Sequence, residues 1–128
     1  MGKDGQKFTL FRNATNTVTY PPRTTLFQEG DEGHLMYAIK RGSVRVLVDG
    51  KAVETLGKDE VFGEMALLEH RARSATVETL EETELVEIDE TQFYTLVSQN
   101  PQFALQLMRL LSARLRRANA LYRLPKGA

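Results

Sequence analysis

Cysteine is absent from this chain of 128 residues, and histidine occurs only at His34 and His70. Without cysteine the chain can form no disulfide, no thiolate metal site and no cysteine nucleophile. The two histidines are far apart in the sequence, so no His-x-His pair suggests a catalytic metal centre, and no Walker-type loop is present. We therefore expect neither a bound metal nor an enzyme.

Long apolar segments are absent as well. The chain begins with a mainly polar segment, Met1–Lys7, and no apolar stretch of the secretory kind follows it. Nowhere do about 18 apolar residues follow one another, so we expect no membrane span and a cytoplasmic chain. Acidic and basic residues balance at 17 each, which suggests no direct DNA binding. The length fits a single domain over residues 1–128.

The balanced total hides an uneven distribution of charge. Residues 78–90 contain seven acids and no base, whereas residues 91–128 contain six bases and no acid. One interpretation is a solvated acidic strand edge followed by a helix whose bases suit its negative dipole end. The other is a basic helix that docks an acidic partner, and the sequence leaves both open.

Short strands account for most of the first two thirds of the chain. Asp49-Gly50 predicts a hairpin, and Val44, Val46 and Val48 would share one face of a strand. Many short strands separated by turn residues are typical of an antiparallel roll. The expected strands cover residues 16–20, 35–39, 43–48, 51–56, 75–80 and 84–88.

Two helices are expected after the roll, over about residues 90–123. Asp89 or Thr91 can cap the first helix, and Asn100-Pro101 can start the second. Apolar residues at helical spacing predict the faces that pack on the roll. These residues are Phe93, Leu96 and Val97 in the first helix and Phe103, Leu107 and Leu110 in the second.

A second apolar stripe follows the last helix at alternating spacings of three and four, the pattern of a coiled-coil seam. It consists of Met108, Leu111, Leu115, Ala118 and Tyr122. Either this stripe also packs on the roll, or it pairs with the same helix of a second copy. We therefore expect a homodimer, or an unidentified effector protein that contacts this helix.

The most informative segment lies near the middle, at residues 63–77. Gly63 precedes a short helix-forming run, and a helix start offers free backbone N–H groups to an anion. Arg73 follows on an extended stretch and can bring a permanent forked cation to the same anion. Glu64 adds a carboxylate, which accepts hydrogen bonds from sugar hydroxyls. The pattern suits a ribose phosphate.

Both halves of this segment, Phe62–Leu68 and Arg73–Val77, resemble the phosphate-binding cassette of the cyclic nucleotide-binding domain family. The resemblance extends to the glycine-punctuated strands around Phe27–Gly33, Tyr37–Ile39 and Gly42–Val46, and covers roughly residues 18–120. It implies a mainly β fold: an antiparallel jelly-roll-type β-roll over about residues 16–88, with the short cassette helix inside it and two C-terminal helices.

The resemblance also implies a role for each matching residue. Arg73, Ser74 and the backbone N–H of Ala66 would hold the cyclic phosphate, and Gly63 and Glu64 the ribose. Tyr122 or Arg123 would cap the base. An apolar wall against the sugar and base would consist of Val46, Val53, Leu56 and Met65.

The expected ligand is cAMP or cGMP, with no further cofactor, and Ser74 after the arginine favours cAMP. Binding would reposition the last helix and so regulate a partner. One alternative is a degenerate roll with an empty pocket that acts as a protein-interaction module through its basic helix. A less favoured one is a cupin-like enzyme.

The chain departs from the family pattern at three places. Ala72 replaces a proline before the arginine, and Asp59-Glu60 replaces a Gly-Asp turn. His34 corresponds to an acidic residue that often supports the arginine. Because a protonated imidazole would repel a guanidinium, this last departure predicts that nucleotide affinity weakens below about pH 6.5.

Overall fold

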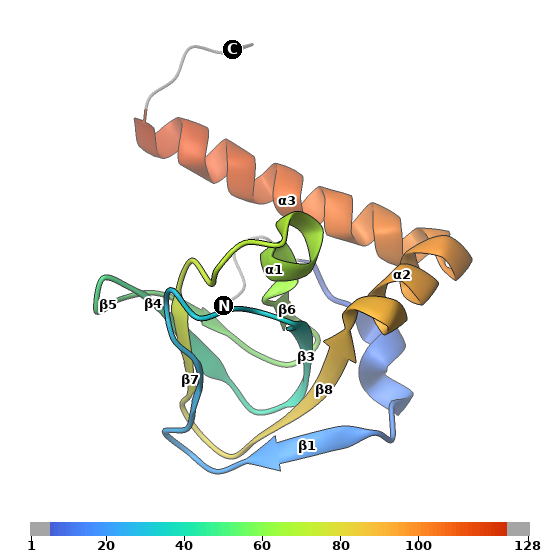
Figure 1. The fold of residues 1–128 in the computed structure, drawn as a ribbon, viewed down its shortest axis with the longest axis horizontal. Coiled ribbons are helices and arrows are strands. Elements are labelled where there is room, and N and C mark those ends of the chain that lie inside the picture. Colours follow the sequence, from blue (N-terminus) through green and yellow to red (C-terminus); the bar gives the residue numbers. More distant parts are fainter. Residues whose placement is uncertain (1–5, 123–128) are drawn as a thin grey trace.

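The computed structural model describes residues 6–122, with side chains through residue 119. Two four-stranded sheets form a roll, and helices cover one side of it (Figure 1). The strands are β1 Thr17–Tyr20, β2 Thr25–Phe27, β3 Leu35–Arg41, β4 Val44–Val48, β5 Lys51–Leu56, β6 Val61–Phe62, β7 Thr76–Thr79 and β8 Thr83–Asp89. The helices are a 3-10 helix η1 Thr9–Asn13, α1 Glu64–Glu69, α2 Glu90–Gln99 and α3 Pro101–Tyr122.

All strand pairs are antiparallel. The strand order is β1-β8-β3-β6 in one sheet and β2-β7-β4-β5 in the other. The predicted fold class, a mainly β antiparallel roll with an internal short helix and two C-terminal helices, is therefore confirmed.

Strand β3 lies between the two parts of the hydrophobic core. Because successive side chains of a strand point to opposite faces, Tyr37 and Ile39 join the cluster inside the roll, where Phe62 and Val77 also lie. Met36 and Ala38 face the other way and pack with the helices. The helix-side cluster is centred on Phe103, which is fully buried and has edge-to-face contacts with the rings of Phe8, Phe11 and Phe93.

The helix boundaries follow local capping chemistry. The side chain of Asp89 accepts a hydrogen bond from the backbone N–H of Gln92, and the Gln92 side chain accepts one from the backbone N–H of Asp89, a complete capping box. Asp89 is thus the N-cap of α2, one of the two residues considered, and Pro101 occupies the first position of α3.

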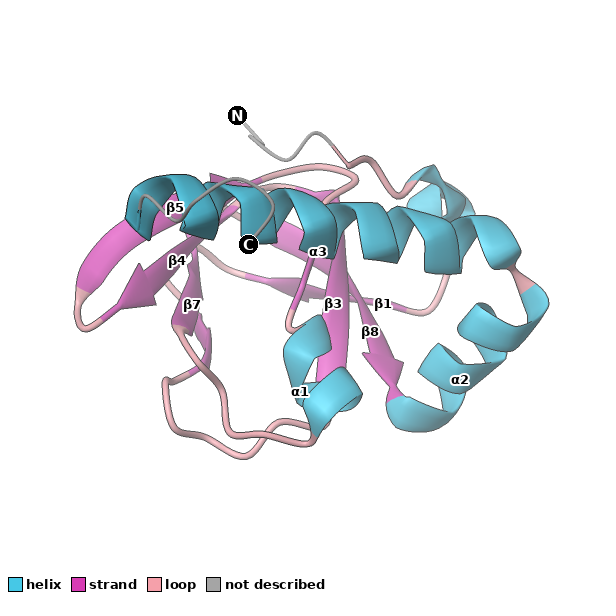
Figure 2. Cartoon of the chain, turned by 90° about the horizontal axis from the view of Figure 1, so that it is seen from above, coloured by secondary structure: helices cyan, strands magenta, loops and turns pink. Residues whose placement is uncertain are grey.

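Helix α3 crosses above α1 and the open side of the roll (Figures 1 and 2). Its first stripe is buried, since Phe103, Leu107 and Leu110 are at most 5% exposed. Its second stripe faces outward: Met108 is 63% exposed and Leu115 is 62% exposed. The interpretation in which both stripes pack on the roll is therefore wrong for these residues.

Three short elements are absent from the sequence prediction: η1, β2 and β6. Strand β6 has only two residues and exists through its pairing with Tyr37 and Ala38 of β3. A segment that short carries no periodicity of its own, so only the tertiary partner defines it.

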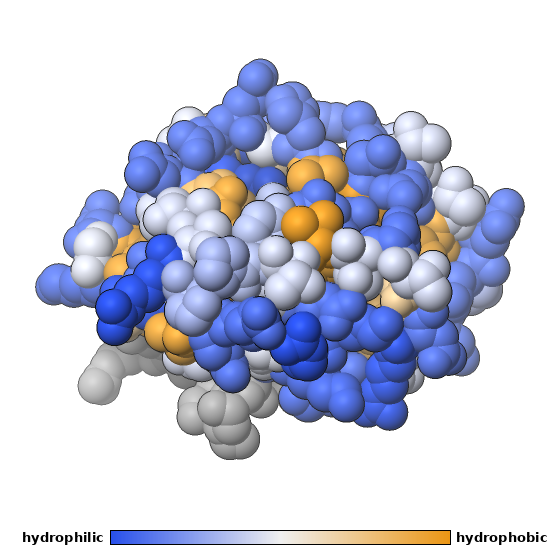
Figure 3. Space-filling view, turned by 90° about the horizontal axis from the view of Figure 1, so that it is seen from below, coloured by the Kyte–Doolittle hydropathy of each residue, from blue (hydrophilic) through white to orange (hydrophobic). Residues whose placement is uncertain are grey.

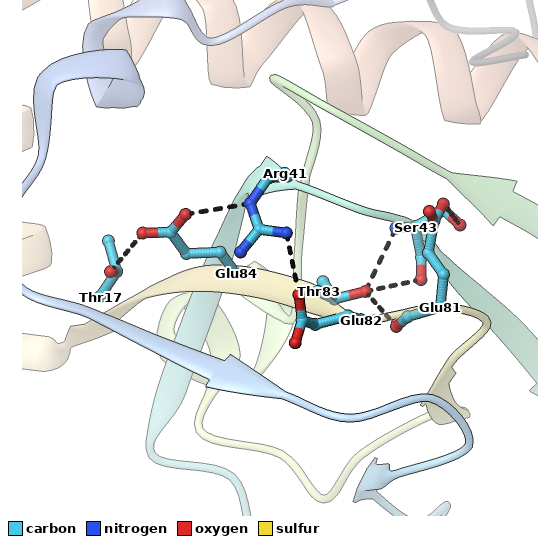
Figure 4. A network of polar contacts seen from close by, with 7 residues as sticks. All are labelled: Thr17, Arg41, Ser43, Glu81, Glu82, Thr83 and Glu84. Atoms are coloured by element: carbon cyan, nitrogen blue, oxygen red, sulfur yellow. Dashed lines mark hydrogen bonds and ion pairs between the residues drawn. The ribbon is translucent and has the colours of Figure 1, made fainter.

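The acidic residues that follow β7 are paired rather than merely solvated. At the turn end of the roll, Arg41 contacts Glu82 at 3.2 Å and Glu84 at 3.5 Å, and Thr17 donates to Glu84 (Figure 4). The buried Thr83 hydroxyl bonds both the N–H and the carbonyl of Ser43. We call this group, Thr17, Arg41, Ser43 and Glu81 to Glu84, the turn network.

The face of the molecule opposite α3 is mostly hydrophilic, with small separate apolar patches (Figure 3). Within the described residues, no helix combines the length and the apolar character needed to cross a bilayer.

Candidate functional site

A cavity lies between the start of α1, the sheet of β4, β5 and β7, and helix α3. Arg73 and Ser74 contribute to its wall after α1, and Arg114 reaches it from α3. The lining residues are Phe27, Val46, Glu54, Leu56, Phe62, Gly63, Glu64, Met65, Ala66, Ala72, Arg73, Ser74, Ala75, Val77 and Arg114.

Helix α1 is bordered at each end by a residue with positive φ. Gly63 is the N-cap with φ 82°, and a Cβ there would lie 2.8 Å from Nη1 of Arg73. Glycine is therefore required for both conformation and space. His70 ends the helix with φ 54°, and its N–H bonds the Ala66 carbonyl. Ala66 is the third residue of α1, so its own N–H has no intrahelical acceptor.

Arg73 is buried beneath the cavity and fixed in orientation. Its Nη1 and Nη2 donate to the carbonyls of Gly63 at 3.1 Å and Leu35 at 2.7 Å. The guanidinium carbon lies 3.9 Å from the centroid of the Phe27 ring, a cation–π contact. Burial lowers the pKa of Arg73, opposed by nearby Tyr37, Glu64 and Asp31. An arginine still remains charged at neutral pH, so the cavity floor is cationic.

Glu64 is the second buried charge of the cavity, at 1% exposure. Arg114 of α3 donates from Nη1 to its Oε2. The other oxygen, Oε1, is fully buried and accepts no hydrogen bond from the described residues. A buried carboxylate oxygen without a partner is costly, so Glu64 retains one strong acceptor for a group that enters the cavity.

Most residues predicted for the site line this one cavity. They are Gly63, Glu64, Ala66, Arg73 and Ser74 on the polar side and Val46, Leu56 and Met65 on the apolar side. Tyr122 belongs to α3, but its side chain lies outside the described part of the molecule, as does all of Arg123, so the base cap stays a prediction.

The prediction that Val53 belongs to the apolar wall is wrong. Val53 is 55% exposed and does not line the cavity, whereas Glu54 does. Strand β5 pairs Val46 with Glu54, and its register then shifts between Val46 and Leu47. Because Leu56 points inward, the residue two positions earlier shares its face, and that residue is Glu54.

Reasoning from the sequence did not predict Phe27, Glu54 and Arg114 as residues of this cavity. The period of two from Leu56 could have identified Glu54. Arg114 carries a weaker sign, since it lies one helical turn past the buried Leu110 and so on the side of α3 that faces the roll. Phe27 has no local sign, because only folding brings it beneath Arg73.

The structure accounts for two of the departures from the family pattern. Asp59 adopts the left-handed conformation itself, with φ 72°, and Arg12 binds its carboxylate at 2.6 Å, so the turn forms without glycine. His34 has a side chain that is 76% exposed and lies 3.5 Å from Glu32. Carbonyl groups hold the guanidinium of Arg73 instead, so the expected pH dependence through His34 has no structural support.

The arrangement can bind, in one cavity, an anion at a fixed guanidinium and a hydroxyl at a buried carboxylate. Among the residues that the structure describes, no three His, Asp or Glu side chains lie close enough together to hold a metal ion.

Comparison with known proteins agrees with this chemistry. The sequence pattern of the cyclic nucleotide-binding domain matches residues 17–100. The cyclic AMP receptor protein of Thermus thermophilus is 35% identical over 105 residues, which are 78% of this chain and 49% of that protein. The chain therefore spans about half the length of this relative.

Solved structures give the same result. The catabolite activator protein of Thermus thermophilus superposes with a TM-score of 0.79 at 30% identity, covering 90% of this chain and 62% of that chain. The cGMP-bound form of the EAL enzyme Bd1971 superposes with a TM-score of 0.64 at 35% identity, covering 82% of this chain and 29% of that one. Such domains thus occur in regulators and in enzymes, and this chain belongs to the cyclic nucleotide-binding domain family.

Proposed function

We propose that this chain is a sensor that binds cAMP in preference to cGMP and repositions helix α3 when the ligand binds. The observation that carries the proposal is the pair of buried charges in one cavity. Glu64 keeps an unpartnered oxygen among the described residues, and Arg73 presents a fixed cation. A cyclic nucleotide supplies a hydroxyl donor for the first and an anion for the second.

Each group has a distinct role in the proposed complex. Arg73 neutralises the cyclic phosphate, helped by the Ser74 hydroxyl and the N–H of Ala66. Oε1 of Glu64 accepts from the ribose 2′-hydroxyl beside the Gly63 backbone. The apolar wall then packs on the sugar and base through Val46, Leu56 and Met65, which line the cavity.

Helix α3 is coupled to the ligand through a shared carboxylate. Arg114 occupies Oε2 of Glu64, and the ribose hydroxyl would occupy Oε1 of the same group. A ligand that fixes the Glu64 carboxylate therefore stabilises the arrangement of α3 in which Arg114 bonds it. By the thermodynamics of population shift, the docked state of α3 gains that difference in binding free energy.

The preference for cAMP rests on Ser74. In family members that prefer cGMP the residue after the arginine is often threonine, and in many that prefer cAMP it is alanine or serine. Ser74 lines the cavity here.

The outward stripe of α3 is the proposed contact for a second copy of the chain or for an effector. Met108, Leu115 and Ala118 are exposed, and Leu111 is half-buried. The alternative function, a degenerate roll that only binds protein, uses the same stripe. It would appear as a dimer that forms without nucleotide and does not respond to it.

Isothermal titration tests the proposal directly. Nucleotide-stripped protein is titrated with cAMP, cGMP and 2′-deoxy-cAMP, using wild type, Arg73→Ala and Arg71→Ala. Removing the buried cation should cost roughly 2–5 kcal/mol, a loss of about thirtyfold or more in affinity. The exposed Arg71 on the same loop is the matched control, and its loss should change little.

The deoxy ligand isolates Glu64. It should bind about tenfold more weakly than cAMP, since it leaves Oε1 without its donor. No heat with any nucleotide, from protein shown to be folded, would overturn the proposal and favour the degenerate roll.

A further inference from the structure

Strand β5 directs an apolar side chain to solvent and a charged side chain into the cavity. The apolar Val53 points to solvent at 55% exposure, while the Glu54 side chain is only 17% exposed and lines the cavity. An ordinary half-buried strand would bury the valine. Taking a carboxylate from water costs free energy unless a partner compensates, so the inward Glu54 opposes stability and calls for another explanation.

The Glu54 carboxylate is held by α3 without being saturated. Nη1 of Arg117 lies 3.6 Å from its Oε2, beyond the 2.7–2.9 Å of a charged hydrogen bond. No hydrogen bond to this carboxylate forms from any residue that the structure describes. Glu54 therefore keeps accepting capacity, and Arg117 sets a donor beside it.

The position of this pair separates it from the phosphate and ribose groups. Glu54 pairs with Val46 on the neighbouring strand and shares its strand face with Leu56. It therefore lies on the side of the cavity that these apolar residues line. Arg117 lies one helical turn after Arg114. Arg114 donates to Glu64, the carboxylate proposed to bind the ribose. The two arginines of α3 thus serve two different carboxylates of one cavity.

We propose that Glu54, positioned by Arg117, is the specificity-determining residue that accepts a hydrogen bond from the exocyclic amino group of adenine. The inference rests on the proposed function and deepens it. A carboxylate accepts a hydrogen bond from the N6 amine of adenine on the major-groove edge of the base. Guanine presents two acceptors, O6 and N7, on the corresponding edge. On this edge the Glu54 carboxylate thus favours adenine for a reason independent of Ser74.

The test separates the amine from the rest of the ligand. Titrations compare cAMP with purine riboside 3′,5′-cyclic monophosphate, which differs from cAMP only in lacking the N6 amine, and with cGMP. The proteins are wild type, Glu54→Leu and Arg117→Gln. Matched controls are Val53→Leu on the outward face of the same strand and Arg116→Gln, whose guanidinium bonds Ser112 within α3.

Wild type should bind cAMP about tenfold more tightly than the amine-free ligand, the effect of one hydrogen bond to a charged group. Glu54→Leu should abolish that ratio by weakening cAMP binding alone, and Arg117→Gln should reduce it several-fold. Glu54→Gln, which keeps a carbonyl acceptor, should retain part of the ratio. Both controls should keep it.

Two results would overturn the inference while leaving the proposed function intact. One is an equal loss of both ligands in Glu54→Leu, which would make Glu54 a general electrostatic or structural group. The other is a wild-type ratio near one. Absence of binding by every nucleotide would instead overturn the proposed function and this inference together.

Discussion

The turn network and the cavity are both built from arginine and glutamate, yet they differ in exposure and in completeness. Arg41 and Glu82 of the turn network have side chains 54% and 64% exposed. In the cavity, Glu64 is 1% exposed and Arg73 is 7% exposed, and each has a buried polar atom without a partner among the described residues. The first group is solvated and satisfied, and the second is dehydrated and incomplete.

The difference separates groups that define the fold from groups kept for a ligand. Exposed ion pairs contribute little free energy, so the turn network mainly fixes which strands meet at the turns. Unsatisfied buried charges cost stability, and a fold retains them where another molecule completes them. Charge pairs of the same composition therefore carry different functions at the two ends of the roll.

The largest expected effect comes from Gly42, beside the turn network. It has φ 101°, and an added Cβ would lie 2.6 Å from the Glu82 carbonyl and from Cα of Thr83. Gly42→Ala should lower the free energy of unfolding by about 3 kcal/mol or more, because backbone must move. Urea denaturation measures this, and the nucleotide affinity of the folded fraction should stay unchanged.

Gly50→Ala is the control for Gly42→Ala. Gly50 also has positive φ, 77°, but no atom lies within 4 Å of the place that an added Cβ would occupy. It should therefore cost only the left-handed backbone penalty of about 1–2 kcal/mol. Equal losses in the two variants would show that the clash at Gly42 relaxes freely.

Gly63→Ala should affect nucleotide binding more than stability, the opposite of what is expected for Gly42→Ala. Its Cβ would lie 2.8 Å from Nη1 of Arg73, so beside the φ penalty of about 1–2 kcal/mol the substitution should shift the guanidinium from the Gly63 and Leu35 carbonyls. The displaced guanidinium should weaken cAMP binding about tenfold or more, as measured by calorimetry. Unchanged affinity in folded protein would contradict the role given to Arg73.

Arg114→Gln and Arg41→Gln compare the two ends of the roll with the same substitution. The Arg114 change leaves the buried Glu64 without its cation and should cost about 1–2 kcal/mol of stability, with a several-fold loss of cAMP affinity. The exposed Arg41 should contribute little to either quantity. Similar losses in both variants would remove the distinction between the two groups.

The smallest effect should be a pH-dependent one at Asp59. Arg12 lowers the pKa of Asp59 by hydrogen bonding, against the opposing effect of burial. This stabilisation is present above the unfolded pKa near 3.9 and is lost as the pH falls through the lower folded pKa. The stability difference between wild type and Arg12→Gln should be largest near pH 7 and shrink below about pH 4. Denaturation curves at pH 7, 5, 4 and 3 check this, and a constant difference would refute it.

The sequence predicted the parts of the molecule that depend on local pattern. The start of α1 after Gly63, the Asp49-Gly50 hairpin and the buried face of α3 follow from glycine placement and periodicity. The residues proposed to bind the phosphate and the ribose lie close together in the sequence, so a single resemblance could name them as a group.

The groups that sequence reasoning missed reach the cavity from distant segments. Glu64 and Arg114 are 50 positions apart, and Arg73 meets Phe27 across 46. No local rule states which side of a roll a later helix will cover. The prediction for Val53 was wrong for a different reason. Its hydrophobicity suggested that it points inward, whereas the alternation of side chains along the strand from Leu56 points Glu54 inward.

Helix α3 is attached very unequally along its length. Phe103, Leu107 and Leu110 bury its first half, and Gln106 bonds the carbonyl of Lys7 at 2.8 Å. Beyond Leu110 the helix runs 12 residues further, about 18 Å, over a cavity that it reaches through arginines. Under the proposed function, a tilt of about 10° about the buried first half would displace the last helical residue by about 3 Å on that helix length. A small change in position at Glu64 would then be a larger one at the end of the helix.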